Sequence, residues 1–297
     1  METTDKYHQL VAASKVSTDD AAIKAAVDKL LAEKCAANKT LDTLKFLLNT
    51  VDLTTLSSTD TATSVMHFTE RVNRFEESHP ELKNVAAICV YAKWAEVVRN
   101  TLEVDGVDVA VCSANFPSSQ AKLEVKVAET ALAVADGADE VDVVFNLGLY
   151  CDDDFEGVYD EVAELKAACK DALLKVILEV GALKTAQHVL AASILSMHAG
   201  CDFIKTSTGK IYDGANPYAA YVMCQAIKEY HELTGRKVGF KVSGGVRTSD
   251  EAVAYYTIVK EVLGQEWLNN KLFRIGASSL ANNLVRDITG DAEAKPF

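Results

Sequence analysis

Eight short apolar runs, many of them rich in β-branched residues, alternate with longer segments of helical spacing along most of the chain. The runs cover residues 47–54, 85–91, 107–115, 140–146, 173–181, 202–209, 238–245 and 273–279. Runs with few polar positions are typical of parallel strands that helices cover. Eight such units favour a closed (β/α)8 TIM barrel, an α/β fold, over a doubly wound sheet, which usually has fewer strands. An open sheet is the structural alternative.

The segments between the runs have apolar residues three or four positions apart, as in amphipathic helices. In the segment 119–137, Gly137 is expected to end the helix, whose inner face would carry Leu123, Val127, Thr130, Ala131 and Val134.

Residues 1–40 lie outside this repeat. The segment 18–38 has one apolar stripe and begins with Thr18 or Asp19 as a helix cap; the stripe consists of Ile23, Val27, Leu30 and Leu31. We expect residues 1–40 to form an N-terminal helical extension that packs on the barrel or on a partner subunit. Residues 41–297 would form the barrel and a short C-terminal tail.

The composition excludes several classes of protein. The chain has a net charge of −13 and no dense run of Lys or Arg, so we expect no nucleic acid and no membrane as a partner. There is no apolar leader and no stretch of 18 uncharged apolar residues, which predicts a cytoplasmic protein. The seven cysteines are odd in number and form no CxxC pair. They therefore indicate neither a disulfide framework nor a zinc site, and most are expected to be buried.

Polar residues recur where the predicted strands end, although the runs around them are built for burial. In a (β/α)8 barrel these C-terminal strand ends carry the chemistry. The residues at these ends are Asp52, Thr54, Cys89, Asn115, Asp142, Asn146, Lys175, Glu179, Lys205, Lys241, Gly276, Ser278 and Ser279.

Three of these residues are lysines in adjacent predicted strands: Lys175, Lys205 and Lys241. Burial and like charge both favour a neutral amine, so one of them could attack a carbonyl group at neutral pH. Such chemistry also needs an acid/base, and Asp142, two strands from Lys205, is the candidate. The structural alternatives are a lysine whose stem merely covers apolar surface and an aspartate that caps a helix or pairs with a lysine.

Small-residue turns follow the last two predicted strands. The backbone N–H groups of "SGGVR" (243–247) and "GASS" (276–279) can bind a phosphate, and Lys210 could add positive charge there. Glu179 is expected to be a structural ion-pair partner, and Cys89 to line the pocket or the core. The six histidines show no HxH or HExxH spacing, so no metal is expected.

The segments "VDLTTL", "AAICVY", "ANFP", "GADEVDVVFN", "LLKVILEVGALK", "FIKTSTGK", "VGFK..GGVRT" and "FR.GASSL" resemble deoxyribose-phosphate aldolase in type and order over residues 41–288. The resemblance implies a class I aldolase that reversibly cleaves 2-deoxy-D-ribose 5-phosphate to D-glyceraldehyde 3-phosphate and acetaldehyde. It implies a small sugar phosphate as substrate, a lysine Schiff base and no cofactor. A homo-oligomer is expected from the resemblance alone.

Position by position, the resemblance implies that Lys205 forms the Schiff base and that Lys241 lowers its pKa. Asp142 would be the acid/base, acting with a water, and Lys175 would complete the network. Pocket residues would be Asp52, Thr54 and Cys89. The implied phosphate-binding residues are Gly209, Lys210, Gly244, Gly245, Arg247, Gly276, Ser278 and Ser279.

The chain departs from the family pattern in a few places. Val242 and Ser243 stand where bacterial members often have Pro and Ala, which leaves the lysine and both glycines in place. Some members end in a tyrosine that assists proton transfer, whereas the printed sequence has Phe297, which cannot donate a proton.

Two other functions fit these residues. The first is another Schiff-base barrel enzyme, such as a transaldolase or a different sugar-phosphate aldolase with a larger ketose donor. The second is a non-catalytic phosphate-binding barrel whose lysines only pair with carboxylates. Borohydride trapping with acetaldehyde alone would separate the deoxyribose-phosphate aldolase from the first of these, because only the former should readily form an iminium with so small a donor.

Overall fold

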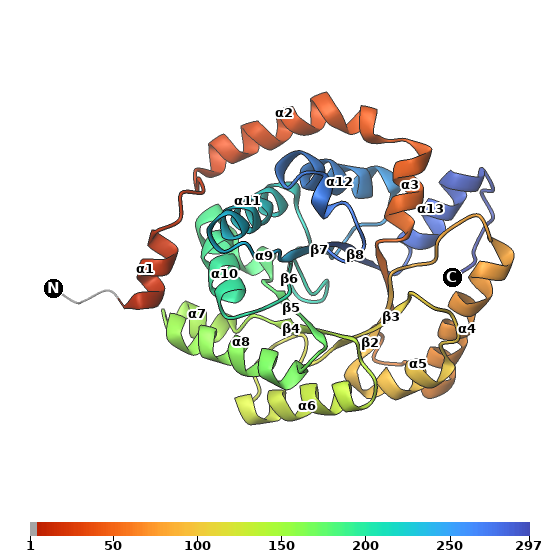
Figure 1. Cartoon of the computed structure of the whole chain (residues 1–297), viewed down its shortest axis with the longest axis horizontal. Helices are drawn as coiled ribbons and strands as arrows, with labels where there is room; N and C mark the ends of the chain where they lie inside the picture. Colours follow the sequence, from red (N-terminus) through yellow and green to blue (C-terminus); the bar gives the residue numbers. More distant parts are fainter. Residues whose placement is uncertain (1–4) are drawn as a thin grey trace.

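The eight predicted strands form one closed parallel barrel in the computed structural model, which describes residues 5–297 (Figure 1). Each strand pairs with its neighbours along the chain, and β1 also pairs with β8, so the open-sheet alternative is wrong. The strands are β1 (Val51–Thr54), β2 (Ala87–Tyr91), β3 (Asp108–Cys112), β4 (Glu140–Val144), β5 (Leu173–Ile177), β6 (Phe203–Lys205), β7 (Gly239–Ser243) and β8 (Phe273–Ala277).

Helices surround the barrel and connect its strands (Figure 1). No helix within residues 5–297 has the length and apolar character needed to cross a membrane. The α-helices are α1 (Lys6–Ala12), α2 (Asp20–Asn38), α3 (Leu41–Leu48), α4 (Ala62–Ser78), α5 (Ala95–Thr101), α6 (Leu123–Ala135), α7 (Leu147–Cys151), α8 (Phe155–Cys169), α9 (Val180–Leu183), α10 (Ala186–His198), α11 (Pro217–Thr234), α12 (Ser249–Val262) and α13 (Leu280–Thr289), with short 3-10 turns η1 (Ala92–Trp94) and η2 (Gln265–Trp267).

The predicted apolar runs contain all eight strands but extend beyond some of them. Leu47 and Leu48, at the start of the first run, end helix α3 instead of starting β1. The fifth run continues past β5 into the short helix α9. Both errors arise because buried helix ends and buried strands are equally apolar in sequence.

Along each strand, residues that face the helices alternate with residues that face the inside of the barrel. Successive strand residues point to opposite faces, and in β1 and β4 the apolar Leu53 and Val141 belong to the core that packs against the helices. Their neighbours Asp52, Glu140 and Asp142 are buried but belong to neither apolar cluster. The apolar core therefore lies between the barrel and its helices, and charged residues occupy the middle of the barrel.

The predicted N-terminal helix is α2, which crosses the outside of the barrel along α11 and α12 (Figure 1). Asp19 caps it by accepting hydrogen bonds from two backbone N–H groups of the first turn. Ile23 and Val27 of the predicted stripe are buried, and the Tyr218 hydroxyl of α11 donates to Asp28 at 3.0 Å. The helix therefore packs on the same chain.

The inner face of α6 differs from the predicted stripe. Ala131 is exposed, whereas Lys126 is fully buried. Its Nζ donates to Glu161 of α8 at 2.6 Å and to Ser119 at 2.8 Å. The apolar spacing missed this residue because a lysine that finds a buried carboxylate can occupy an inner position.

Candidate active site

Two lysines meet one carboxylate at the C-terminal end of the barrel. Lys205 ends β6, and its Nζ donates to Oδ2 of Asp142 on β4 at 2.7 Å. The Nζ of Lys241, on the adjacent strand β7, donates to the same oxygen at 2.7 Å. All three side chains are almost completely buried, and Lys205, 4% exposed, is the most accessible. The sequence prediction that these residues come together is consistent with this geometry.

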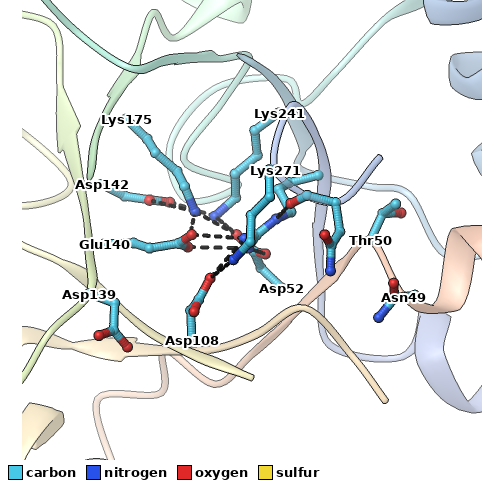
Figure 2. Close-up of polar contacts among 12 residues, drawn as sticks. Asn49, Thr50, Asp52, Asp108, Asp139, Glu140, Asp142, Lys175, Lys241 and Lys271 are labelled. Atoms are coloured by element: carbon cyan, nitrogen blue, oxygen red, sulfur yellow. Dashed lines mark hydrogen bonds and ion pairs between the residues drawn. The ribbon is translucent and has the colours of Figure 1, made fainter. Parts of the chain in front are cut away.

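A second set of buried charges contacts Asp142 and Lys241 inside the barrel (Figure 2). Asp52 Oδ2 binds Lys241 at 2.5 Å and Lys175 at 3.1 Å, and its Oδ1 accepts from Arg274 at 2.7 Å. Glu140 Oε1 accepts from the Arg274 guanidinium at 2.8 Å, and Oε2 binds Lys175. Carboxylates and cations thus alternate across the barrel, and each charged group has a partner.

A glycine of β8 makes room for this layer. A Cβ atom on Gly276 would lie 3.2 Å from Cε of Lys241 and 3.1 Å from Cβ of Ser243. Both distances are tighter than ordinary van der Waals contact. Gly276 therefore allows the Lys241 side chain to cross the barrel toward Asp142.

The neighbouring cations keep two of the carboxylates ionised. Burial alone would raise the pKa of Asp142, but Lys205 and Lys241 outweigh it and hold that pKa well below its usual range. Burial likewise opposes ionisation of Asp52, and the charges of Lys175, Lys241 and Arg274 lower its pKa well below the ordinary value.

The resting Lys205 amine differs from the sequence-based expectation of a neutral group. Burial, the largest single effect, lowers its pKa, and Lys241 lowers it further, as expected, but the Asp142 carboxylate and the adjacent thiols of Cys112 and Cys89 raise it, and the net shift of the pKa is upward. The expectation omitted a carboxylate within hydrogen-bonding distance. Lys205 therefore rests as the charged half of an ion pair.

An open cavity of about 270 Å³ lies above Lys205. It is lined by small loop residues that follow β6, β7 and β8, together with Thr54 and Leu56. Its lining includes Lys205 and all the residues predicted to bind phosphate: Gly209, Lys210, Gly244, Gly245, Arg247, Gly276, Ser278 and Ser279.

Backbone geometry shapes this cavity. Gly209 and Gly244 have φ values of +71° and +86°, which side chains other than glycine rarely adopt. Ser279 precedes helix α13, but its side chain makes no capping hydrogen bond. The unpaired N–H groups at this helix start suit an anion.

Comparisons with known proteins agree with this arrangement. The sequence profile of DeoC/LacD family aldolases matches residues 46–282. Deoxyribose-phosphate aldolase of Homo sapiens is 41% identical over 249 residues, 80% of this chain and 78% of the relative. The enzyme of that name from Mus musculus is 43% identical over the same shares. The chain belongs to the DeoC/LacD aldolase family.

A solved structure supports the same conclusion for this aldolase. The tetrameric deoxyribose phosphate aldolase from Aeropyrum pernix has a TM-score of 0.66 and 25% sequence identity. The match covers 88% of this chain and 96% of the other. This chain therefore shares its overall fold with an aldolase of known structure.

Sequence reasoning missed part of the buried network of this aldolase. Glu140 and Arg274 bind each other and the predicted residues, and Asp108 accepts from Arg274 at 3.1 Å. The sequence did indicate that Glu140 faces the inside of the barrel, because it lies two positions before Asp142 and must share its face of the strand. Arg274 lies two positions before Gly276 in the same way.

Some predicted strand-end residues have structural partners away from the lysines. Asn146 caps α7 and donates to Glu161 at 2.9 Å. The Asn115 side chain accepts from the N–H of Gln120 within its own loop. Glu179 binds the backbone and hydroxyl of Thr208 at 3.1 and 2.5 Å and has no ion-pair partner within residues 5–297, so its expected ion-pair role is wrong.

The predicted pocket residues lie at different depths. Thr54 lines the cavity, whereas Asp52 is fully buried among the lysines beneath it. Cys89 is 1% exposed and lies beside Cys112, outside the cavity lining. Phe297 packs against Phe75 of α4, at a ring-centroid distance of 4.6 Å, on the outside of the barrel.

Proposed function

We propose that this protein is a class I deoxyribose-phosphate aldolase that reversibly cleaves 2-deoxy-D-ribose 5-phosphate to D-glyceraldehyde 3-phosphate and acetaldehyde. The observation that carries the proposal is the position of Lys205. Its amine lines the cavity and at the same time donates to the buried Asp142 carboxylate. The names of the relatives support the same activity.

The cavity suits a small phosphorylated sugar bound in one orientation, with its phosphate at the glycine loops and its aldehyde at Lys205. The glycine loops, Arg247 and Lys210 would bind the phosphate through backbone N–H groups and positive charge. The Lys210 amine donates to the carbonyl of Leu56 at 2.5 Å, which holds it at the cavity wall. The aldehyde end of the open-chain sugar would then approach Lys205.

Of the two lysines that share Asp142, Lys205 can lose its proton more easily than Lys241. It pairs with Asp142 alone among the carboxylates of residues 5–297, and it shares that oxygen with Lys241. Lys241 has a second carboxylate in Asp52, and the pKa of Lys241 is raised well above its ordinary value despite burial. A neutral Lys205 would leave Asp142 still paired with Lys241.

The chemistry follows from a neutral amine at Lys205. The nitrogen adds to the aldehyde carbon C1, and the resulting carbinolamine loses water to give an iminium ion. A base removes the C3 hydroxyl proton and the C2–C3 bond breaks. Its electron pair forms the C1–C2 double bond while the C=N electrons move to nitrogen, which gives a neutral enamine. D-glyceraldehyde 3-phosphate leaves, the enamine takes a proton at C2, and water releases acetaldehyde and the free amine.

Asp142 is the proposed group for these proton transfers, directly or through a water. Its Oδ2 accepts from both lysines, whereas Oδ1 is buried and has no hydrogen-bond partner within residues 5–297. Oδ1, which lies 3.9 Å from the Lys175 amine and accepts no hydrogen bond, would accept a proton and return it. Lys241 would keep Asp142 oriented and would disfavour a charged Lys205.

The test is the cleavage rate of 2-deoxy-D-ribose 5-phosphate by Lys205→Met. We expect loss of turnover with an unchanged circular dichroism spectrum, because methionine fills the space of the lysine stem but has no amine. Lys29→Met removes an exposed lysine of α2 and should keep the full rate. A Lys205→Met protein with the wild-type rate would refute the assignment.

We propose further that the protein forms a homo-oligomer, on the basis of the tetrameric relative. Light scattering at micromolar concentration is the test. A monomer at all concentrations would contradict this part of the proposal only.

A further inference from the structure

Two cysteines lie side by side in the barrel wall next to the candidate active site. Cys89 of β2 and Cys112 of β3 are both buried, and their Sγ atoms are 4.0 Å apart. They are separated by 23 positions in sequence, so no short motif reveals the pair. One carboxylate oxygen of Asp142 lies within 4.8 Å of both sulfur atoms.

One carboxylate oxygen of Asp142 is available to coordinate a metal ion. Oδ2 accepts the hydrogen bonds of Lys205 and Lys241, while the buried Oδ1 has no hydrogen-bond partner among the described residues and lies 3.9 Å from the Lys175 amine. Buried carboxylate oxygens normally accept a hydrogen bond. A buried oxygen that accepts none therefore indicates a ligand or a proton that binds there transiently.

The sulfur positions fit a tetrahedral metal ion. Zinc binds thiolates at about 2.3 Å, and two such bonds to atoms separated by this distance enclose an angle of roughly 120°. A carboxylate oxygen is an ordinary third ligand, which leaves the fourth position for water. Hard cations such as Mg²⁺ prefer oxygen ligands and should not bind.

The charge of the surroundings does not oppose binding. Each thiol gives up its proton to solvent as its sulfur binds the cation, so two protons are exchanged for one dication. The total charge beside Lys205 and Lys241 is then unchanged. The wall around the thiols is made of the small residues Ala87 and Ala110, against which Leu56 of the open cavity packs.

We propose that Cys89, Cys112 and Asp142 form an inhibitory site for a thiophilic divalent cation such as Zn²⁺. Binding would occupy Asp142 Oδ1 and prevent its proton transfers. The inhibitory part rests on the proposed aldolase function, whereas the binding part does not.

Binding is tested with Co²⁺, whose thiolate complexes absorb by charge transfer, and with Zn²⁺ in equilibrium dialysis. The background is Cys35→Ser/Cys151→Ser, which removes the half-buried and exposed thiols of α2 and α7. We expect one ion per chain and a thiolate band. Cys112→Val should lose the band and bind Zn²⁺ at least about 100-fold more weakly, since even indirect supports of a metal site are worth 10- to 100-fold.

The matched control is Cys201→Val, which removes another buried thiol that lies elsewhere in the chain. It should keep both the band and the affinity. If Cys112→Val fails to fold, Cys112→Ala replaces it. A missing band in the background protein, or a band that persists without the Cys112 thiol, would overturn the site.

Inhibition is measured as the loss of aldolase rate relative to the metal-free rate of each variant. Zn²⁺ should inhibit the background protein, Mg²⁺ should not, and Cys112→Val should resist Zn²⁺. Ion binding without inhibition would overturn the inhibitory role. A protein that binds Co²⁺ but never cleaves the sugar phosphate would reject the proposed function and leave the binding site supported.

Discussion

At the scale of single residues, the position of Lys205 distinguishes it from the other buried lysines. It reaches the cavity, and Asp142 is its one carboxylate partner within residues 5–297. Their positions where the predicted strands end were sufficient to predict that Lys205, Lys241 and Asp142 lie together at one end of the barrel. The sequence could not give the sign of the Lys205 pKa shift, because that depends on a 2.7 Å contact between strands that are not neighbours.

Asp142→Asn tests this electrostatic account. The carboxylate raises the pKa of Lys205, so its removal leaves burial and Lys241 to lower that pKa. The amine should become neutral, and therefore reactive, at a lower pH than in the wild type. Turnover should nevertheless fall by about 100-fold or more, because a general acid/base is lost.

The measurement is the rate of trapping by acetaldehyde and cyanoborohydride as a function of pH. The midpoint of the rise should move to lower pH in Asp142→Asn. An unchanged or higher midpoint would mean that Asp142 does not control the amine.

At the scale of elements, loops and helix ends position the site around rigid strands. The loops after β6, β7 and β8 form the cavity, and their glycine-rich sequences predicted it. Sequence periodicity was less informative for α6, where Lys126 occupies the inner face. Its bonds to Ser119 and Glu161 connect α6 and α8 to the loop that follows β3.

Lys126→Ala should destabilise the fold by about 3–5 kcal/mol, because it leaves Glu161 buried without its cation. The exposed Lys122 just before the same helix provides the control, and Lys122→Ala should change stability by less than about 0.5 kcal/mol. Urea unfolding measures both values. Equal stability of the two variants would contradict a structural role for the buried pair.

Ser279→Asp tests the phosphate cavity at the start of α13. A carboxylate there should repel the substrate phosphate and raise KM for 2-deoxy-D-ribose 5-phosphate by about tenfold or more, a change near 1.4 kcal/mol. Trapping with acetaldehyde, which has no phosphate, should be unaffected. If both reactions weaken equally, the effect does not depend on the phosphate, which would contradict a phosphate-binding role for this helix start.

At the scale of the whole molecule, an apolar shell between strands and helices surrounds a charged barrel interior. The shell follows from the eight apolar runs, which is why the closed barrel was predictable. The interior network was only partly predictable, since Glu140 and Arg274 have no motif and acquire partners only when β1, β4, β5 and β8 close around them. The Cys89 and Cys112 pair escaped notice for the same reason.

The central claim is that the Lys205 amine forms the covalent bond to the substrate. The most direct test is to reduce the adduct with acetaldehyde and to map the modified lysine by mass spectrometry of peptides. The account predicts an ethyl group on Lys205 and unmodified Lys175, Lys241 and Lys210. An ethyl group on another of these lysines, or no adduct at all, would contradict it.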